Sequence, residues 1–250
     1  MTVQLDARQR AMLAEMGVRL FVSAANAPRA EPAVPATVRA AVPVVSQPVR
    51  APSERSAVVQ DASVADMDWD ALTQAVASCQ ACGLCQGRRQ AVLGVGDRRA
   101  DWLVVGEAPG EMEDLQGTPF VGPAGKLLDN MLRAMGLGRD ENVYLTNVLK
   151  CRPPGNRNPD PTERAQCEPF LRRQVMLLQP RIIVAMGRFA VQSLLGSDEP
   201  IGKLRGQVHR YQGVPVVVTY HPDYLLRNLL DKAKAWADLC LALDQVAAAS

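Results

Sequence analysis

The chain has 250 residues, of which 48% are hydrophobic, enough for one substantial domain with extensions. Its formal net charge is +2, so it is not a histone-like polycation, and any binding of nucleic acid has to use a local basic patch. No run approaches the length of a membrane span, and the first residues lack the apolar core of a signal peptide. We therefore expect a cytoplasmic protein, in which cysteines act as ligands or free thiols rather than as disulfides.

The first part of the chain differs in composition from the rest. Residues 5–21 can form a short amphipathic helix, with Leu13, Met16 and Leu20 on one face. A stretch rich in proline, alanine and valine follows, which predicts a flexible linker as far as about residue 64. We expect residues 1–64 to be this helix and linker, and residues 65–250 to be the catalytic domain. The N-terminal helix could tether a protein partner.

From residue 65, predicted strands and helices alternate. Four apolar runs predict strands at 102–105, 143–149, 181–186 and 214–220. Helices are expected at 66–78, from 123 to 135, from 161 onwards, between the third and fourth strands as far as Gly196, and at 229–248. This alternation predicts an α/β fold, a three-layer α/β/α sandwich around a central, mainly parallel four-stranded sheet.

Three unusual segments follow predicted strands, namely 106–114, 146–147 and 221–222. Ligands bind beyond the carboxyl ends of such strands, so we expect these segments to meet in one crevice. Asn147 offers the donor and acceptor needed to read a base edge, although it could also cap a loop. His221 could donate a proton, and Glu107 could reach a water or a sugar, although a surface glutamate in a tight turn is the alternative. Phe120 lies in a loop of turn residues, as a stacking platform or as part of the core.

Four cysteines follow a C-x2-C and C-x15-C pattern: Cys79, Cys82, Cys151 and Cys167. Zinc and an iron–sulfur cluster both accept four thiolates, so spacing leaves the metal open, and four ordinary buried thiols are the alternative. Cys85 and Cys240 lie outside the pattern and are expected to be ordinary thiols, although Cys85 could substitute for a ligand in a disturbed site.

Several longer stretches resemble the type-4, iron–sulfur uracil-DNA glycosylases. They are GEAPGEMEDLQGTPFVGPAGKLLDNML at 106–132, YLTNVLKCRPPGNRNPDPTERAQC at 144–167 and HPDYLLRN at 221–228, together with the first cysteine pair. The resemblance covers nearly all of residues 75–240. It implies a DNA-repair enzyme that flips uracil out of DNA and hydrolyses its N-glycosidic bond, leaving an abasic site. It also implies a structural [4Fe–4S] cluster on the four cysteines.

The resemblance assigns roles to the crevice. Phe120 would stack on the flipped uracil, and Asn147 would pair with its N3–H and O4. Backbone at Ala108 and Gly110 would complete the cradle, and His221 would donate to uracil O2. The best-known relatives carry an aspartate at the position of Ala108, so the group that positions water lies between Glu107 and Asn147. Gly110 stands where a tyrosine can exclude thymine's methyl group, so discrimination against thymine is looser or comes from elsewhere.

The resemblance also implies a DNA surface, in which Lys126, Arg152 and Arg157 contact phosphates. The segment 221–228, with Arg227, would lie near the minor groove. Leu225 or Leu226 would wedge into the space that the base leaves, with helix packing as the alternative. We expect a monomer acting on single- or double-stranded uracil-containing DNA.

Three other functions remain to be weighed. A relative that traps the abasic sugar covalently carries a histidine-bearing basic insertion, and residues 106–150 contain no histidine. A non-catalytic, cluster-bearing DNA-binding protein would not need Glu107, Asn147 and His221 together. A zinc-stabilised hydrolase of free nucleotides would differ from an iron–sulfur protein in its visible absorbance.

Overall fold

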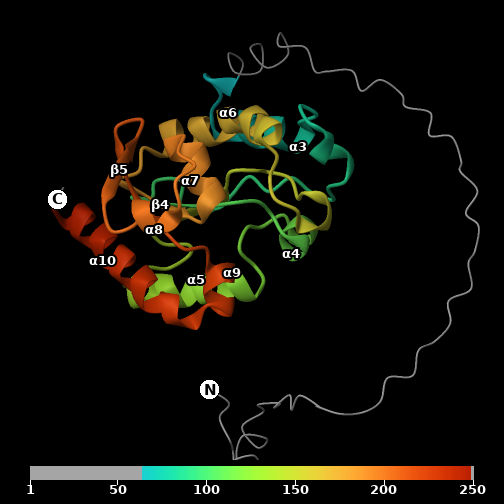
Figure 1. Ribbon diagram of the computed structural model, residues 1–250. Coiled ribbons are helices and arrows are strands. Elements are labelled where there is room, and N and C mark those ends of the chain that lie inside the picture. The colour runs from blue at the N-terminus through green and yellow to red at the C-terminus, as the bar shows by residue number, and fades with distance from the viewer. Residues whose placement is uncertain (1–63, 249–250) are drawn as a thin grey trace, which may run out of the picture. The chain divides into compact units, whose positions relative to one another are not determined.

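The computed structural model describes residues 64–248, and the expected N-terminal helix and most of the linker lie outside this part (Figure 1). Its centre is a six-stranded sheet in the order β1-β3-β2-β4-β6-β5. The strands are β1 (Val95–Gly96), β2 (Trp102–Gly106), β3 (Val143–Asn147), β4 (Ile182–Met186), β5 (Val208–Tyr211) and β6 (Val214–Thr219).

The four predicted strands are the parallel ones, β3, β2, β4 and β6, and they pair side by side. The prediction of a mainly parallel sheet is confirmed. The predicted number of four strands was too low, because the sheet has six. β1 and β5 pair antiparallel at the two edges. β1 has only two residues, and β5 is only partly buried, so neither carries the apolar run that marks a buried strand.

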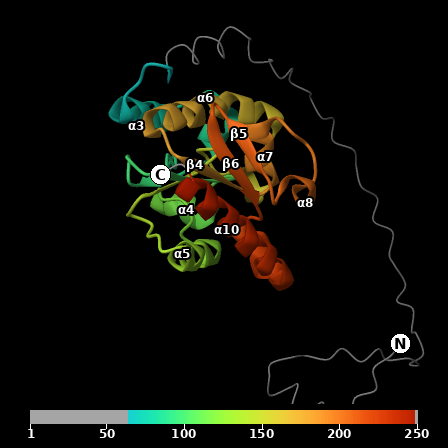
Figure 2. The ribbon, with the colours of Figure 1, turned by 90° about the vertical axis from the view of Figure 1, so that its left-hand side faces the viewer.

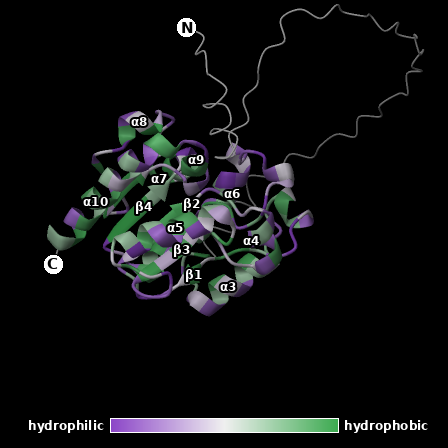
Figure 3. Ribbon diagram, turned by 90° about the horizontal axis from the view of Figure 1, so that it is seen from below, coloured by the Kyte–Doolittle hydropathy of each residue, from purple (hydrophilic) through white to green (hydrophobic). Residues whose placement is uncertain are grey.

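Helices cover both faces of the sheet. Helices α3 (Trp69–Ser78), α6 (Pro161–Leu178) and α7 (Arg188–Leu195) lie on one side, and α5 (Pro123–Ala134) and α10 (Lys232–Ala248) lie on the other (Figures 1 and 2). Side chains alternate along each strand, so that Leu103 and Val105 pack with α6 and α7, whereas Trp102 and Val104 pack with α5 and α10. The strands carry the apolar colour in Figure 3, as expected for a sheet that is buried on both faces. The three-layer prediction is confirmed.

Several short helices were not predicted. They are α4 (Glu111–Gln116), α8 (Ile201–Leu204), α9 (Pro222–Arg227) and the 3-10 helices η1 (Gly83–Gln86) and η2 (Pro154–Asn156). The helix expected at 229–248 is divided into the 3-10 helix η3 (Leu229–Asp231) and α10. The segment 106–114 is therefore half loop and half helix. Its helical part begins where the Glu113 carboxylate accepts a hydrogen bond from the Gly110 N–H at 3.0 Å.

The register of the parallel strands brings their carboxyl ends to one edge. Gly106 pairs with Asn147, and Met186 pairs with Thr219. Pairing continues past β3, since Leu149 N donates to Glu107 O at 3.1 Å. The segments after β2, β3 and β6 therefore lie together, as the sequence predicts.

The first turn of α5 packs directly against the loop that carries Phe120. A Cβ atom on Gly125 would lie 1.7 Å from the backbone oxygen of Phe120, well inside van der Waals contact. Only glycine allows this close approach.

We predict that Gly125→Ala destabilises the protein, although alanine normally favours a helix over glycine by about 1 kcal/mol. The added methyl group has to displace the Phe120 backbone, which we expect to cost about 1–3 kcal/mol in urea unfolding. Gly202→Ala in α8 is the matched control, because its Cβ would meet nothing within 4 Å. Equal stability of the Gly125→Ala variant and the unaltered protein would contradict this packing.

Candidate active site

Three side chains from distant segments converge above the end of β2. A Cβ atom on Gly106 would lie 2.4 Å from Asn147 Oδ1 and 2.5 Å from Phe120 Cζ, so the amide and the phenyl ring share the space over this glycine. The rings of Phe120 and His221 stack with centroids 5.9 Å apart and planes 28° apart. An amide, a phenyl ring and an imidazole thus gather at one edge of the sheet.

Asn147 is buried but has an unpaired side chain. It is the last residue of β3 and is 3% exposed, and within residues 64–248 its side-chain amide forms no hydrogen bond. Its amide atoms are not among the fully buried unpaired polar atoms of the described region, so they remain open to a ligand. The amide offers one acceptor and two donor hydrogens to a ligand at this place.

His221 is the N-cap of α9, and its Nδ1 accepts a hydrogen bond from Asp223 N at 3.2 Å. Because Nδ1 is an acceptor, the ring proton lies on Nε2 and is free for donation to a ligand. Burial lowers the pKa of His221 to about 4, against the opposing charge of Asp223. The imidazole is therefore neutral at physiological pH. Gly187, directly after β4, packs against it, with a Cβ position 3.1 Å from His221 Cβ.

Glu107 lines two adjoining clefts of about 570 and 410 Å³, and His221 and Asp223 line both as well. Burial raises the pKa of the Glu107 carboxyl to about 7, and the charge of Arg188 opposes this effect. The carboxyl group is thus poised to change charge near neutral pH. The sequence analysis did not select Arg188, although it is the first residue of α7 and lies two residues after the end of β4.

Arg139 holds the loop of Phe120 and was also not predicted. Its guanidinium donates to the backbone oxygens of Pro119 at 2.9 Å and Phe120 at 2.6 Å, and to Asp129 Oδ1 at 2.9 Å. Phe120 has a φ of 55°, in the left-handed region that a phenylalanine rarely adopts. The planar fork of Arg139 compensates for this conformation and fixes the ring. No local sequence pattern marks such a contact.

Ala108 and Gly110 line the smaller cleft beside Glu107. Ala108 packs toward the core around the cysteines. The Gly110 N–H is already bonded to Glu113, whose carboxylate also accepts from Val121 N at 3.2 Å. That carboxylate joins the strand-end loop to the loop of Phe120.

The expected DNA-contacting residues lie on the surface, with the exception of the buried Leu225. Lys126 is exposed on α5. Arg152 bonds Asn156 Oδ1 at 2.8 Å, and Arg157 pairs with Glu163 at 2.5 Å. Arg227 pairs with Asp223.

Of the two candidate wedges, Leu225 is 1% exposed and Leu226 is 38% exposed. Leu225 is therefore packed inside the protein, which agrees with helix packing, the alternative to a wedge role for this residue. Only Leu226 of the pair has a side chain that DNA could reach.

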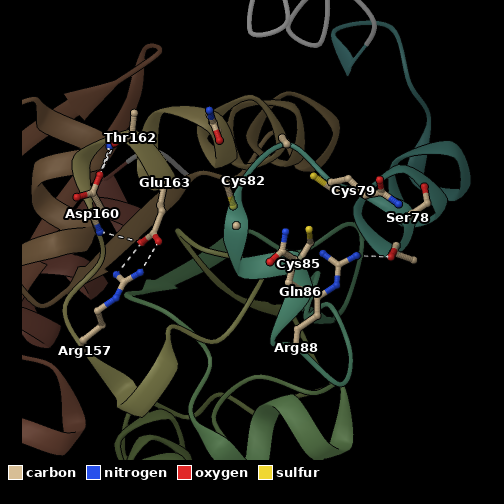
Figure 4. Close-up of a pocket in the computed structure, with 15 residues that line it drawn as sticks. Ser78, Cys79, Cys82, Cys85, Gln86, Arg88, Arg157, Asp160, Thr162 and Glu163 are labelled. Carbon is tan, nitrogen blue, oxygen red and sulfur yellow. Dashed lines mark hydrogen bonds and ion pairs between the residues drawn. The ribbon is translucent and has the colours of Figure 1, made fainter. Parts of the chain in front are cut away.

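The four cysteines of the sequence pattern line one enclosed cavity, and Cys85 lines it too. Cys79 ends α3, Cys82 precedes η1, Cys151 follows β3 and Cys167 lies in α6. Figure 4 shows Cys79, Cys82 and Cys85 beside Arg88, at a surface hollow of about 1050 Å³ that opens next to the cavity. Cys85 therefore belongs to this cysteine group in space, unlike the expectation from spacing. Cys240 does not line the cavity.

The cavity supplies hydrogen-bond donors to sulfur. Arg88 Nη1 donates to Cys151 Sγ at 3.0 Å, and Lys150 N donates to Cys167 Sγ at 3.3 Å. Such donors stabilise thiolates and the sulfur ligands of metal centres. Within residues 64–248, no group of three or more His, Cys, Asp or Glu side chains is arranged to hold a single metal ion.

Comparison with known proteins shows the family to which the chain belongs. The sequence profile of the Uracil DNA glycosylase superfamily matches residues 93–240. The chain belongs to this superfamily. Within it, the chain is similar to relatives named Type-4 uracil-DNA glycosylase, which confirms the resemblance seen in the motifs.

The type-4 relative of Archaeoglobus fulgidus is 44% identical over 165 residues, which are 63% of this chain and 82% of the relative. That of Thermotoga maritima is 45% identical over 159 residues, again 63% of this chain and 82% of the relative. A protein of Pyrobaculum aerophilum named Type-5 uracil-DNA glycosylase is 34% identical over 152 residues, or 53% of this chain and 66% of the relative. Among the helices of the described region, none is both long and apolar enough to cross a membrane.

Proposed function

We propose that this protein is a uracil-DNA glycosylase of base excision repair, and that residues 65–250 form its catalytic domain. The observation that carries the proposal is the Asn147 amide, which has no hydrogen-bond partner among residues 64–248, beside the Phe120 ring and the Nε2–H of His221. These are the three kinds of group needed to hold a flipped pyrimidine: a surface for stacking, a reader of its edge and a donor to its leaving oxygen. The superfamily match and the type-4 relatives support the same activity.

Asn147 selects the base. Its Oδ1 accepts from uracil N3–H, and its Nδ2 donates to uracil O4. Cytosine presents an acceptor and a donor in the reversed order, so a fixed amide would leave groups unpaired on both sides. Since Asn147 is buried against Gly106, it cannot turn toward water to relieve this mismatch, and the cost of an unpaired group is about 1–3 kcal/mol.

His221 assists the departure of the base. Bond cleavage leaves negative charge on uracil O2 and positive charge on the sugar. A neutral imidazole with its proton on Nε2 can donate a hydrogen bond to that oxygen. Because the ring is already buried, little hydration has to be lost when the bond forms. One preorganised donor of this kind is typically worth about 3–4 kcal/mol of barrier.

Glu107 acts on the sugar side. It lines the open clefts next to His221, whereas Asn147 is 3% exposed and lines neither of them. In its ionised form Glu107 can orient the attacking water and stabilise the cationic sugar. We therefore assign the water-positioning role to Glu107 rather than to Asn147, with Ala108 and Gly110 forming the wall of the cleft beside it.

DNA is held around the site by Lys126, Arg152, Arg157 and Arg227, with Leu226 as the wedge. All three arginines already pair with acidic or amide side chains, so phosphates have to replace those partners when DNA binds. The substrate is uracil-containing DNA, and we propose that the protein acts as a monomer.

We further propose a [4Fe–4S] cluster on Cys79, Cys82, Cys151 and Cys167. The proposal is supported by the donor set, since four thiols line one cavity and Arg88 and the Lys150 N–H donate to sulfur. The cavity measures about 10 Å³, so the cysteine side chains have to spread apart around a cluster. When bound, the cluster would act as a structural cross-link. The cysteines tie the end of α3, the segment after β3 and α6 together, and they leave the reaction itself to the side chains at the strand ends.

We predict that His221→Ala slows uracil excision by roughly 10²–10³-fold, because one oxyanion donor is lost. Binding to uracil-containing oligonucleotides should be spared. The excision rate is measured by cleaving the abasic product with alkali and quantifying the cleaved strand. His209→Ala is the control, since His209 lies on β5 with its Nε2 bonded to Leu204 O. If His221→Ala cleaves as fast as the His209→Ala protein, the donor assignment is wrong.

We predict that the single-turnover excision rate rises with pH through about 7, because Glu107 has to ionise and burial raises its pKa to about 7. His221 stays neutral across this range, since its pKa is lowered to about 4. In Glu107→Gln, this limb of the pH–rate profile should disappear along with most of the rate. A profile with the same inflection in both proteins would assign it to another group.

We predict that Cys151→Ser, purified without oxygen, loses iron and the broad visible absorbance of a cluster, while Cys240→Ser keeps both. Iron content per chain and the absorbance spectrum are measured on the full chain. Zinc in place of iron in the unaltered protein, or equal iron in the two variants, would refute the cluster proposal.

A further inference from the structure

A fully buried lysine lies next to the candidate active site without a carboxylate partner. Lys150 is 1% exposed and is the largest fully buried side chain of the described region. Its Nζ donates to Thr146 Oγ1 at 2.7 Å, to the backbone oxygen of Asn147 at 2.7 Å and to Gln174 Oε1 at 2.6 Å. All three acceptors are uncharged. An apolar side chain of the same volume would fill this space without the cost of burying an ammonium, so filling the core does not explain the residue.

Lys150 lies between the cysteine cavity and Asn147. Its backbone N–H donates to Cys167 Sγ at 3.3 Å, and its side chain lines the cysteine cavity. At the other end, its ammonium holds the carbonyl of Asn147. Gln174, which receives its shortest hydrogen bond, lies on α6, the helix that also carries Cys167. One side chain therefore connects Asn147 to the helix behind the cysteines.

The contact determines how the peptide of Asn147 is oriented. This peptide is held on two sides, since Val148 N donates to Gly106 O at 3.0 Å and the Asn147 oxygen accepts from Lys150. The side-chain amide has no partner of its own in residues 64–248. Its direction is set by the backbone of Asn147 and by packing over Gly106 beside the Phe120 ring, and the lysine fixes that backbone where β3 ends.

We propose that Lys150 is a positioning residue for base recognition: by holding the Asn147 carbonyl against α6, it aims the Asn147 amide at the extruded uracil. The proposal rests on the function proposed above. It requires that Lys150 contributes to recognition of the base and not to the grip on the DNA backbone.

The test compares binding of two oligonucleotides by the full chain and by Lys150→Met. One carries a 2′-fluorinated deoxyuridine, which resists cleavage, and the other carries a tetrahydrofuran abasic site, which has no base to read. We expect Lys150→Met to weaken binding of the uracil oligonucleotide about tenfold and to change binding of the abasic one by less than about twofold, as the loss of one buried hydrogen bond at the reader implies. Iron content should stay that of the unaltered protein.

Lys126→Met is the matched control. This exposed lysine is proposed to contact phosphate, so its loss should weaken both oligonucleotides alike.

If Lys150→Met does not fold, a second pair of variants decides. Thr146→Val removes one acceptor of the ammonium and keeps the shape of the side chain, whereas Thr146→Ser keeps the hydroxyl. Thr146→Val should weaken uracil binding selectively, and Thr146→Ser should restore it.

Equal weakening of both oligonucleotides by Lys150→Met, or no weakening of either, would overturn the positioning role. The same is true of the second pair if Thr146→Val and Thr146→Ser behave alike. The unaltered chain is assayed alongside for release of uracil. If it releases none, the proposed function fails first, so the two failures can be told apart.

Discussion

The site depends on the register of two parallel strands. β2 and β3 pair so that Gly106 stands opposite Asn147, and the missing side chain of Gly106 leaves the space that the Asn147 amide and the Phe120 ring occupy. A shift by one residue would turn Asn147 to the other face of the sheet. The hydrophobic alternation that fixes this register in the core therefore also fixes the chemistry at the edge. Helices on both faces hold the strands in this register, which explains why the site needs the whole sandwich.

Burial gives each polar group at this edge its chemical character. The Asn147 amide has no hydrogen-bond partner within residues 64–248, and removal from water keeps the His221 imidazole neutral and raises the pKa of the Glu107 carboxyl to about 7. The unpaired Asn147 amide can therefore bind a ligand. The neutral His221 ring can donate from Nε2, and the Glu107 carboxyl titrates near neutral pH. The clefts beside Glu107 are open, whereas Phe120 and Asn147 are buried. This asymmetry matches a reaction in which the base leaves on one side and water enters on the other.

The sequence predicted those features that depend on local pattern. Apolar runs predicted the four parallel strands. Glu107, Asn147 and His221 were selected because they lie at or just after the ends of these strands. Cysteine spacing identified four thiols that do share a cavity. Features made by tertiary contact were missed: the edge strand β1 has two residues, and nothing in the sequence around Arg139 shows that it binds the Phe120 loop. Leu225 and Leu226 are identical in type and adjacent, and only the packing of α9 separates the buried one from the exposed one. Cys85 lies outside the spacing pattern yet faces the same cavity, because η1 turns it back.

The central claim is that Phe120, Asn147 and His221 surround a single extruded uracil. A crystal structure of the protein with a product complex of uracil and abasic DNA tests it most directly. The account predicts uracil stacked on Phe120, with N3–H and O4 on the Asn147 amide and O2 within about 3 Å of His221 Nε2. Uracil bound elsewhere, or bound here without contact to the Asn147 amide, would contradict it.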